Sequence, residues 1–180
     1  MTMPGLPFRL LIASTAIWAW VIVAVGGLVR VSRSGLGCPD WPLCGGRVVP
    51  AGDKEPIIEY SHRFTAGTVT VLLLVCTIWA FTRYRSQRNV TVPLLAALLL
   101  VPFQALLGAV VVWLELPGRI VGLHFMVGMV FLGTIVYAAA AAWRGDAPVS
   151  RGYRLVALWA AGTSTLLISL GATVVATGAM

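Results

Sequence analysis

Long apolar segments alternate with short charged ones along almost the whole chain of 180 residues. Each apolar segment is close to the roughly 20 residues that a helix needs to cross a bilayer. The segments are continuously apolar rather than alternating in polarity, which favours helices over the strands of a membrane barrel. We therefore predict an all-α integral membrane protein, an up-and-down bundle of five transmembrane helices. The predicted helices cover about residues 10–29, 61–83, 91–114, 120–143 and 155–177.

The composition supports a membrane protein and leaves little room for anything else. Hydrophobic residues make up 59% of the chain and charged residues 11%, and the mean hydropathy is +0.92. Soluble domains carry about 25% charged residues, so we expect a single membrane domain over residues 1–180 with lipid as its surroundings. The net charge of +7 is spread over the flanks of the predicted spans, so we predict no nucleic-acid partner.

The first apolar segment has the position of a signal peptide. It is longer than the usual apolar core of about 7–15 residues and lacks a clear small-x-small cleavage site, so we expect it to remain as a helix. The short loops at 83–92 and 143–154 hold most of the basic residues that would share a side with the N-terminus. Because short basic loops stay inside, this favours a cytoplasmic N-terminus.

The segment 31–60 is the only long connection between predicted helices, and it contains Cys38-Pro-Asp-Trp-Pro-Leu-Cys44. We expect a disulfide between these cysteines, which would close a rigid cap outside the membrane. Two free thiols or half of a metal site are the alternatives, although no His or third Cys lies nearby to complete a zinc site. A disulfide persists in an oxidising compartment, so it also favours a multi-pass protein of the cell membrane with this loop and the C-terminus outside.

The two histidines of the chain lie near the same side of the predicted bundle. His62 and His124 are each within about two turns of the outer start of a helix, and alternate helices of an up-and-down bundle can face each other across the core. Two imidazoles at one depth suit the axial ligands of a haem iron, in a four-helix haem-binding bundle plus one extra helix. The alternatives are interfacial polar residues, or a zinc or copper site completed by Glu59.

Glu59 precedes His62 by three residues, so both side chains lie on one face of a helix. A carboxylate one turn from an iron ligand could take up a proton or stabilise positive charge at the porphyrin edge. Alternatively, Glu59 caps the positive end of the helix. Three arginines are candidates for contacts with haem propionates, or with lipid headgroups: Arg30, Arg33 and Arg63.

An internal repeat closes the odd-numbered predicted helices. The segments 26–31, 108–113 and 171–176 each begin with glycine, continue with a small residue and contain valine. The first two are followed by an outer loop and a helix that bears a histidine. We expect the glycines mainly to permit close helix packing. Glycines on the histidine helices could leave room for a flat macrocycle: Gly67, Gly122 and Gly128.

These motifs together resemble haem A synthase. The resemblance rests on Gly-Gly-Leu-Val-Arg-Val at 26–31, on the Cys-Pro-Asp-Trp-Pro-Leu-Cys segment within 34–44, on Glu-Tyr-Ser-His-Arg at 59–63, and on the segment 104–124. It covers about residues 20–130 with specific motifs and the last predicted helix more loosely. The resemblance implies an oxidation of the methyl group on carbon 8 of haem O to a formyl group, through successive hydroxylations, giving haem A for terminal oxidases of the respiratory chain.

The resemblance also implies roles for individual residues. The substrate haem would lie between His62 and His124 as axial ligands, with Glu59 as the essential catalytic carboxylate. Cys38 and Cys44 would match a disulfide-capable outer pair of the family.

The chain departs from the family in its length. Members usually have eight helices in two similar halves, of which the second holds a haem b. We expect that two copies associate, that a second membrane subunit supplies the rest, or that the chain is a reduced form. The first hypothesis is a half-size haem A synthase acting as a homo-oligomer. The alternative is a non-catalytic bis-His subunit that binds a haem such as haem b for electron transfer or structural support in a larger membrane complex.

Overall fold

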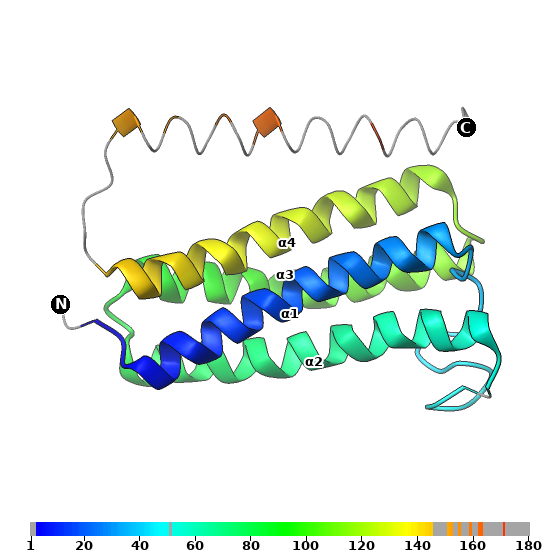
Figure 1. Ribbon diagram of the computed structural model, residues 1–180, viewed down its shortest axis with the longest axis horizontal. Coiled ribbons are helices and arrows are strands. Elements are labelled where there is room, and N and C mark those ends of the chain that lie inside the picture. The colour runs from blue at the N-terminus through cyan, green and yellow to red at the C-terminus, as the bar shows by residue number, and fades with distance from the viewer. Residues whose placement is uncertain are drawn as a thin grey trace.

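The computed structural model describes residues 3–50 and 52–145, and isolated positions between 151 and 171. Four long helices account for most of the described chain (Figure 1). They are α1 (Leu6–Val31), α2 (Lys54–Arg83), α3 (Arg88–Trp113) and α4 (Gly118–Arg144). Within the described residues, the only β pairing is an isolated bridge between Cys44 and Arg47.

The four helices form an up-and-down bundle. Each helix packs against the next one in the chain and α1 also packs against α4, whereas α2 and α4 lie diagonally across the bundle from each other. We call the end where α1 and α3 begin the N-terminal end. The opposite end, where α2 and α4 begin and the segment 32–53 lies, is called the loop end (Figure 1).

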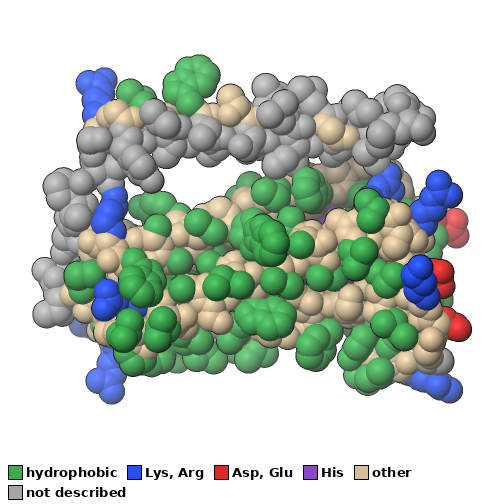
Figure 2. Space-filling view, in the orientation of Figure 1, with side chains coloured by type: hydrophobic (Ala, Val, Ile, Leu, Met, Phe, Trp, Pro, Cys, Tyr) green, Lys and Arg blue, Asp and Glu red, His purple; other side chains and the backbone are tan. Residues whose placement is uncertain are grey.

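The surface of the bundle matches a membrane environment. All four helices are long and apolar enough to cross a bilayer. On the face shown in Figure 2, hydrophobic side chains cover the flanks, while charged side chains gather at the two ends. Large apolar side chains such as Ile17, Trp20 and Leu99 are more than 60% exposed in the isolated chain. The protein is therefore a multi-pass membrane protein, because such side chains are stable when they face lipid.

The prediction of an all-helical membrane bundle is confirmed, but the described residues form four long helices where five were predicted for the whole chain. The predicted helix at 155–177 lies almost entirely outside the described residues. The largest difference in a boundary is at α2, which begins at Lys54 rather than near residue 61. The charged and proline-containing start of this helix reads as loop in the sequence, yet proline fits the first turn of a helix and charges there remain near the membrane surface.

The hydrophobic core is concentrated in the N-terminal half of the bundle. Its residues interdigitate from all four helices. Aromatic rings close this end, where Phe8 packs against Trp79 and Tyr84 with ring centroids 5.8 and 5.0 Å apart. Arg9 lies over the ring of Trp143, which donates a hydrogen bond of 3.2 Å to the Arg9 carbonyl. The largest fully buried apolar side chains of this core are Phe8, Ile12, Val69, Leu73, Val90, Leu94 and Ile135.

The half of the bundle near the loop end is packed differently. In the described chain, no residue is buried between Ala19 and Val31 of α1, between Ala97 and Ala109 of α3, or from Gly118 through Val130 of α4. The helices that contribute buried residues here are α2, with the polar Glu59 and Thr65, and the last turns of α3, with Ala109 and Val112. The fold therefore joins a close-packed half to a half with few buried apolar side chains.

Candidate functional site

Both histidines lie in the loosely packed half, on the two helices that face each other diagonally. At 1.5 Å per residue, His62 is about 12 Å along α2 and His124 about 9 Å along α4 from the first residue of its helix. Since both helices begin at the loop end, the two side chains have similar depths.

Each imidazole retains a buried nitrogen atom that has no partner. The Nδ1 atoms of His62 and His124 are both buried and accept or donate no hydrogen bond within the described chain. Buried polar atoms are nearly always paired, so an unpaired one requires an explanation such as an absent ligand or water. Two buried imidazoles with unpaired nitrogens fit a metal macrocycle, because haem supplies four equatorial nitrogens and needs only two axial ligands from the protein.

A conventional zinc or copper site is not formed from these side chains. Among the described residues, no group of three or more His, Cys, Asp or Glu side chains is arranged to hold a metal ion. Zinc sites normally use at least three protein ligands. The donor set at the loop end therefore fits haem better than an isolated metal ion.

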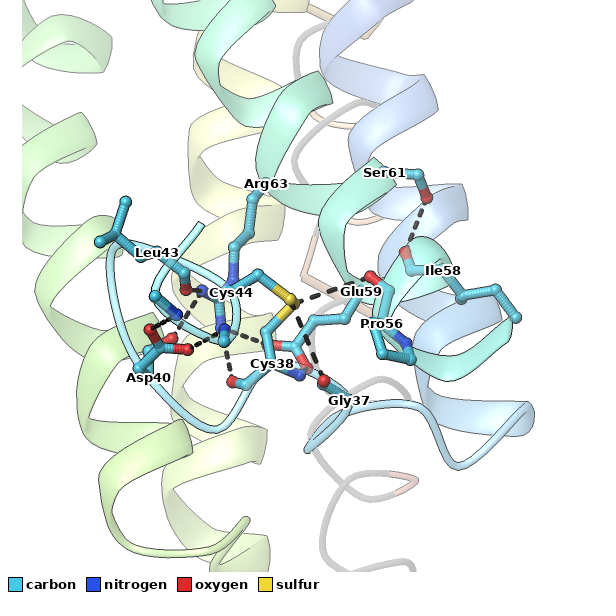
Figure 3. The surroundings of a disulfide bond; sticks show 12 residues. Gly37, Cys38, Asp40, Leu43, Cys44, Pro56, Ile58, Glu59, Ser61 and Arg63 are labelled. Atoms are coloured by element: carbon cyan, nitrogen blue, oxygen red, sulfur yellow. Dashed lines mark hydrogen bonds and ion pairs between the residues drawn. A yellow bond between two sulfur atoms is a disulfide. The ribbon is translucent and has the colours of Figure 1, made fainter. Parts of the chain in front are cut away.

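The predicted disulfide between Cys38 and Cys44 is present, with Cα atoms 4.5 Å apart (Figure 3). It closes the tip of the loop, where Asp40 accepts hydrogen bonds of 2.5 and 2.8 Å from the backbone N–H groups of Gly45 and Gly46. Both glycines have positive φ angles, +62° and +69°, which favour glycine at these positions. The hydrogen bond from Gly46 is the main cause that lowers the pKa of Asp40 below its ordinary value.

Glu59 joins this loop to α2. Its carboxylate accepts a hydrogen bond of 2.8 Å from the backbone N–H of Cys38 and is paired with the Arg63 guanidinium (Figure 3). The side chain of Glu59 is buried, with a relative exposure of 5%. Glu59 lies in the second turn of α2, whereas the acidic residue of the first turn is Glu55. The alternative that Glu59 caps the start of the helix is therefore wrong.

The Arg63 side chain binds backbone carbonyl groups of the same loop. Its guanidinium donates hydrogen bonds of 2.8 Å to the Asp40 carbonyl, 2.6 Å to that of Leu43 and 3.0 Å to that of Cys38 (Figure 3). These contacts and the Glu59 pair engage most of its donors. We call the set formed by Cys38, Glu59, Arg63 and the disulfide the loop clamp.

Gly37 explains why the loop can lie so close to α2. A Cβ atom at this position would come within 2.5 Å of the Glu55 backbone. Only glycine fits such an approach. Trp41 and Trp113 further attach the loop to α3, with ring centroids 6.4 Å apart in an edge-on arrangement.

The two other predicted propionate contacts remain available at the loop end. Arg30 is exposed in the last turn of α1, and Arg33 is exposed just after that helix. Their contact with propionates stays a prediction. The same prediction for Arg63 competes with the four groups that its guanidinium already contacts.

Three further residues of the site carried no functional role in the sequence interpretation. Gln104 of α3 donates a hydrogen bond of 3.1 Å to the His124 carbonyl, while its own side-chain oxygen is buried and has no partner in the described chain. Gly26 and Gly108 lie beside the His62 and His124 rings respectively. An amide in an apolar helix and a repeated glycine were the signals that could have identified them.

The comparisons with known proteins agree with one another. A family model described as "Cytochrome oxidase assembly protein" (COX15-CtaA) matches residues 9–180. The chain is 34% identical over 148 residues to a heme A synthase of Halalkalibacterium halodurans and 36% identical over 148 residues to one of Alkalihalophilus pseudofirmus. Each match covers 78% of this chain and 50% of the relative. A heme A synthase of Bacillus licheniformis is 35% identical over 130 residues, which cover 71% of this chain and 43% of the relative.

The matched part of the chain thus spans about half the length of these curated relatives. The family model nevertheless covers the loop clamp, both histidines and all but the first residues of α1. The chain belongs to the COX15-CtaA family of cytochrome oxidase assembly proteins, whose curated members that it matches are heme A synthases.

Proposed function

We propose that the protein is a haem A synthase-type oxidoreductase that oxidises the C8 methyl group of haem O to a formyl group. Membership of the family and the names of its relatives support a role in haem A synthesis. One observation carries the assignment of the site. His62 and His124 lie at similar depth on diagonal helices, in the half of the bundle that has few buried apolar residues, and each keeps a buried nitrogen without a partner in the described chain.

In this proposal His62 and His124 hold the haem iron and so fix the macrocycle between α2 and α4. The bound haem supplies the redox-active iron and also the methyl carbon that is oxidised. Glu59 lies one turn before His62, where its carboxylate would be placed to hold a proton or to stabilise positive charge near the substrate haem. Arg30 and Arg33 at the loop end would pair with the propionates.

Arginine and cysteine positions support the orientation that we propose. The N-terminus would be cytoplasmic, and the loop with its disulfide would lie outside the cell membrane, where oxidising conditions preserve the bond. We also propose that a second copy of the chain or another membrane subunit takes part in the electron pathway away from the haem.

One observation favours a second candidate function. Both oxygens of Glu59 are engaged, one by the Cys38 N–H and one by Arg63, so this carboxylate has a structural role even without a substrate. A protein in which Glu59 only anchors the loop would be a non-catalytic bis-His subunit, carrying haem b for electron transfer or structural support of a larger membrane complex.

Extraction of the bound haems distinguishes the two candidates. The protein is produced in cells that supply haem O, purified, and its haems are separated by chromatography. The oxidoreductase predicts haem A in the wild type and none in Glu59→Gln, with haem O still bound to the variant. The exposed Glu55 lies one turn earlier on the same helix, so Glu55→Gln is the matched control and should still yield haem A.

Two results would contradict the catalytic proposal. Haem b without any haem A, despite an adequate supply of haem O, would leave only the non-catalytic subunit. Normal yields of haem A from Glu59→Gln would remove this carboxylate from the chemistry.

A further inference from the structure

The His62 ring lies directly against the backbone of α1 at Gly26. A Cβ atom on Gly26 would be 3.1 Å from Cε1, 3.5 Å from Nδ1 and 3.9 Å from Nε2 of His62. All three of the nearest atoms belong to the imidazole and none to the backbone of α2. The glycine therefore makes room for the ring, rather than for a close approach of the two helices.

Two other glycines provide internal comparisons. A Cβ atom on Gly27 would meet no atom within 4 Å in the described chain, apart from its own helix backbone and chain neighbours. Gly108 occupies the equivalent place in the internal repeat, and its Cβ would lie 3.5 Å from Cε1 of His124. A distance of 3.5 Å is an ordinary van der Waals contact, whereas 3.1 Å requires the ring or the helix to move.

We propose that Gly26 is a positioning residue that seats the His62 imidazole against the backbone of α1, and that the equivalent Gly108 seats His124 less tightly. A methyl group at position 26 would push the ring away from α1, because its carbon would lie 3.1 Å from Cε1. The glycines of the repeat thus set how firmly each histidine is held. That this fixes a haem ligand rests on the proposed function, but the contact itself does not.

The first test needs no haem. The chain has two histidines, so apo-protein labelled at histidine gives two sets of ring signals in an NMR spectrum, which a His124→Gln variant assigns. Gly26→Ala should move the His62 Cε1 signal by more than its linewidth, and Gly27→Ala should leave it in place. Gly108→Ala should move the His124 signal only slightly. Equal spectra for Gly26→Ala and Gly27→Ala would overturn the proposal.

A double-mutant cycle covers the case in which Gly26→Ala folds poorly. If the added methyl group clashes with the ring, Gly26→Ala should lower the thermal midpoint when His62 is present and leave it unchanged in a His62→Ala background. A loss of the same size in both backgrounds would mean that Gly26 serves helix packing alone, and would overturn the proposal.

Carbon monoxide binding reports on the loaded protein. Reduced haem with two firm histidine ligands excludes carbon monoxide, so the wild type and Gly27→Ala should bind little, whereas most of the Gly26→Ala protein should bind it. If the wild type holds no haem between the histidines, the proposed function is wrong. The apo-protein tests then still show whether Gly26 positions His62. If the wild type and Gly26→Ala exclude carbon monoxide equally well, Gly26 does not position His62, and the proposed function stands.

Discussion

The two halves of the bundle use their residues for different purposes. In the N-terminal half, apolar side chains from all four helices meet in one core, and polar groups such as Thr77 are satisfied within their own helix. Near the loop end, three of the four helices have long stretches without a buried residue. The buried polar atoms without partners in the described chain include the Nδ1 atoms of both histidines and the side-chain oxygen of Gln104, all in this half.

This contrast separates stability from function within one fold. A close-packed core gains dispersion contacts, and every cavity in it is costly. The half with histidines and glycines gives up such contacts, which is the expected arrangement where a ligand supplies the missing partners. Substitutions should therefore affect folding mainly in one half and haem binding mainly in the other.

The largest effect is expected at the loop clamp. Arg63→Ala would leave the buried Glu59 carboxylate without its charged partner and release three loop carbonyls. Breaking a buried pair by removing one partner typically costs about 3–5 kcal/mol. Hydrogen exchange should show reduced protection of the amides from Cys38 to Arg47. The exposed Arg119 at the same end provides the control Arg119→Ala, and equal protection in both variants would contradict the clamp.

A substitution in the core should cost almost as much but act elsewhere. Leu73 is fully buried in the N-terminal half, whereas Leu106 of α3 is 58% exposed. Leu73→Ala should lower the free energy of unfolding by about 2–5 kcal/mol because a cavity remains, and Leu106→Ala by less than about 1 kcal/mol. Unfolding monitored by circular dichroism in detergent checks this. Similar losses in both variants would remove the distinction between the core and the lipid-facing surface.

The candidate site could be predicted only in part from the sequence. The apolar runs predicted the helices, and the pair His62 and His124 followed from depth alone. The contact of Glu59 with Cys38 could not be predicted, because it joins residues 21 positions apart through an irregular loop. The clamp role of Arg63 was missed for the same reason.

Substitutions at Gln104 and Thr77 should change the stability of the apo-protein in opposite directions. Gln104→Leu removes a buried oxygen that has no partner in the described chain, so the apo-protein should be unchanged or more stable by up to about 1 kcal/mol. Thr77→Val removes a hydroxyl that donates a hydrogen bond of 2.7 Å to the Leu73 carbonyl. This substitution should lower the free energy of unfolding by up to about 1 kcal/mol. Thermal unfolding of the apo-proteins measures both. A clear loss in Gln104→Leu would show that this amide supports the fold.

The smallest expected effect is a change in the loop at low pH, caused by protonation of Asp40. The pKa of Asp40 is lowered in the folded loop, so its ionised carboxylate stabilises the folded loop. This stabilisation is fully present above the ordinary pKa of 3.8 and is lost as the pH falls through the lower pKa of the folded state. The amide signals of Gly45 and Gly46 should therefore stay constant at neutral pH and shift only below about 3.8. Asp40→Asn should abolish this titration. A shift near neutral pH would contradict the assignment to Asp40.

The spectrum of the bound haem tests the central claim most directly. Electron paramagnetic resonance of the oxidised wild type should show a low-spin, six-coordinate iron, and His62→Ala and His124→Ala should each lose that signal. Ser61→Ala, next to His62, is the matched control and should keep it. An unchanged low-spin signal in both histidine variants would show that the haem is not held between these two side chains.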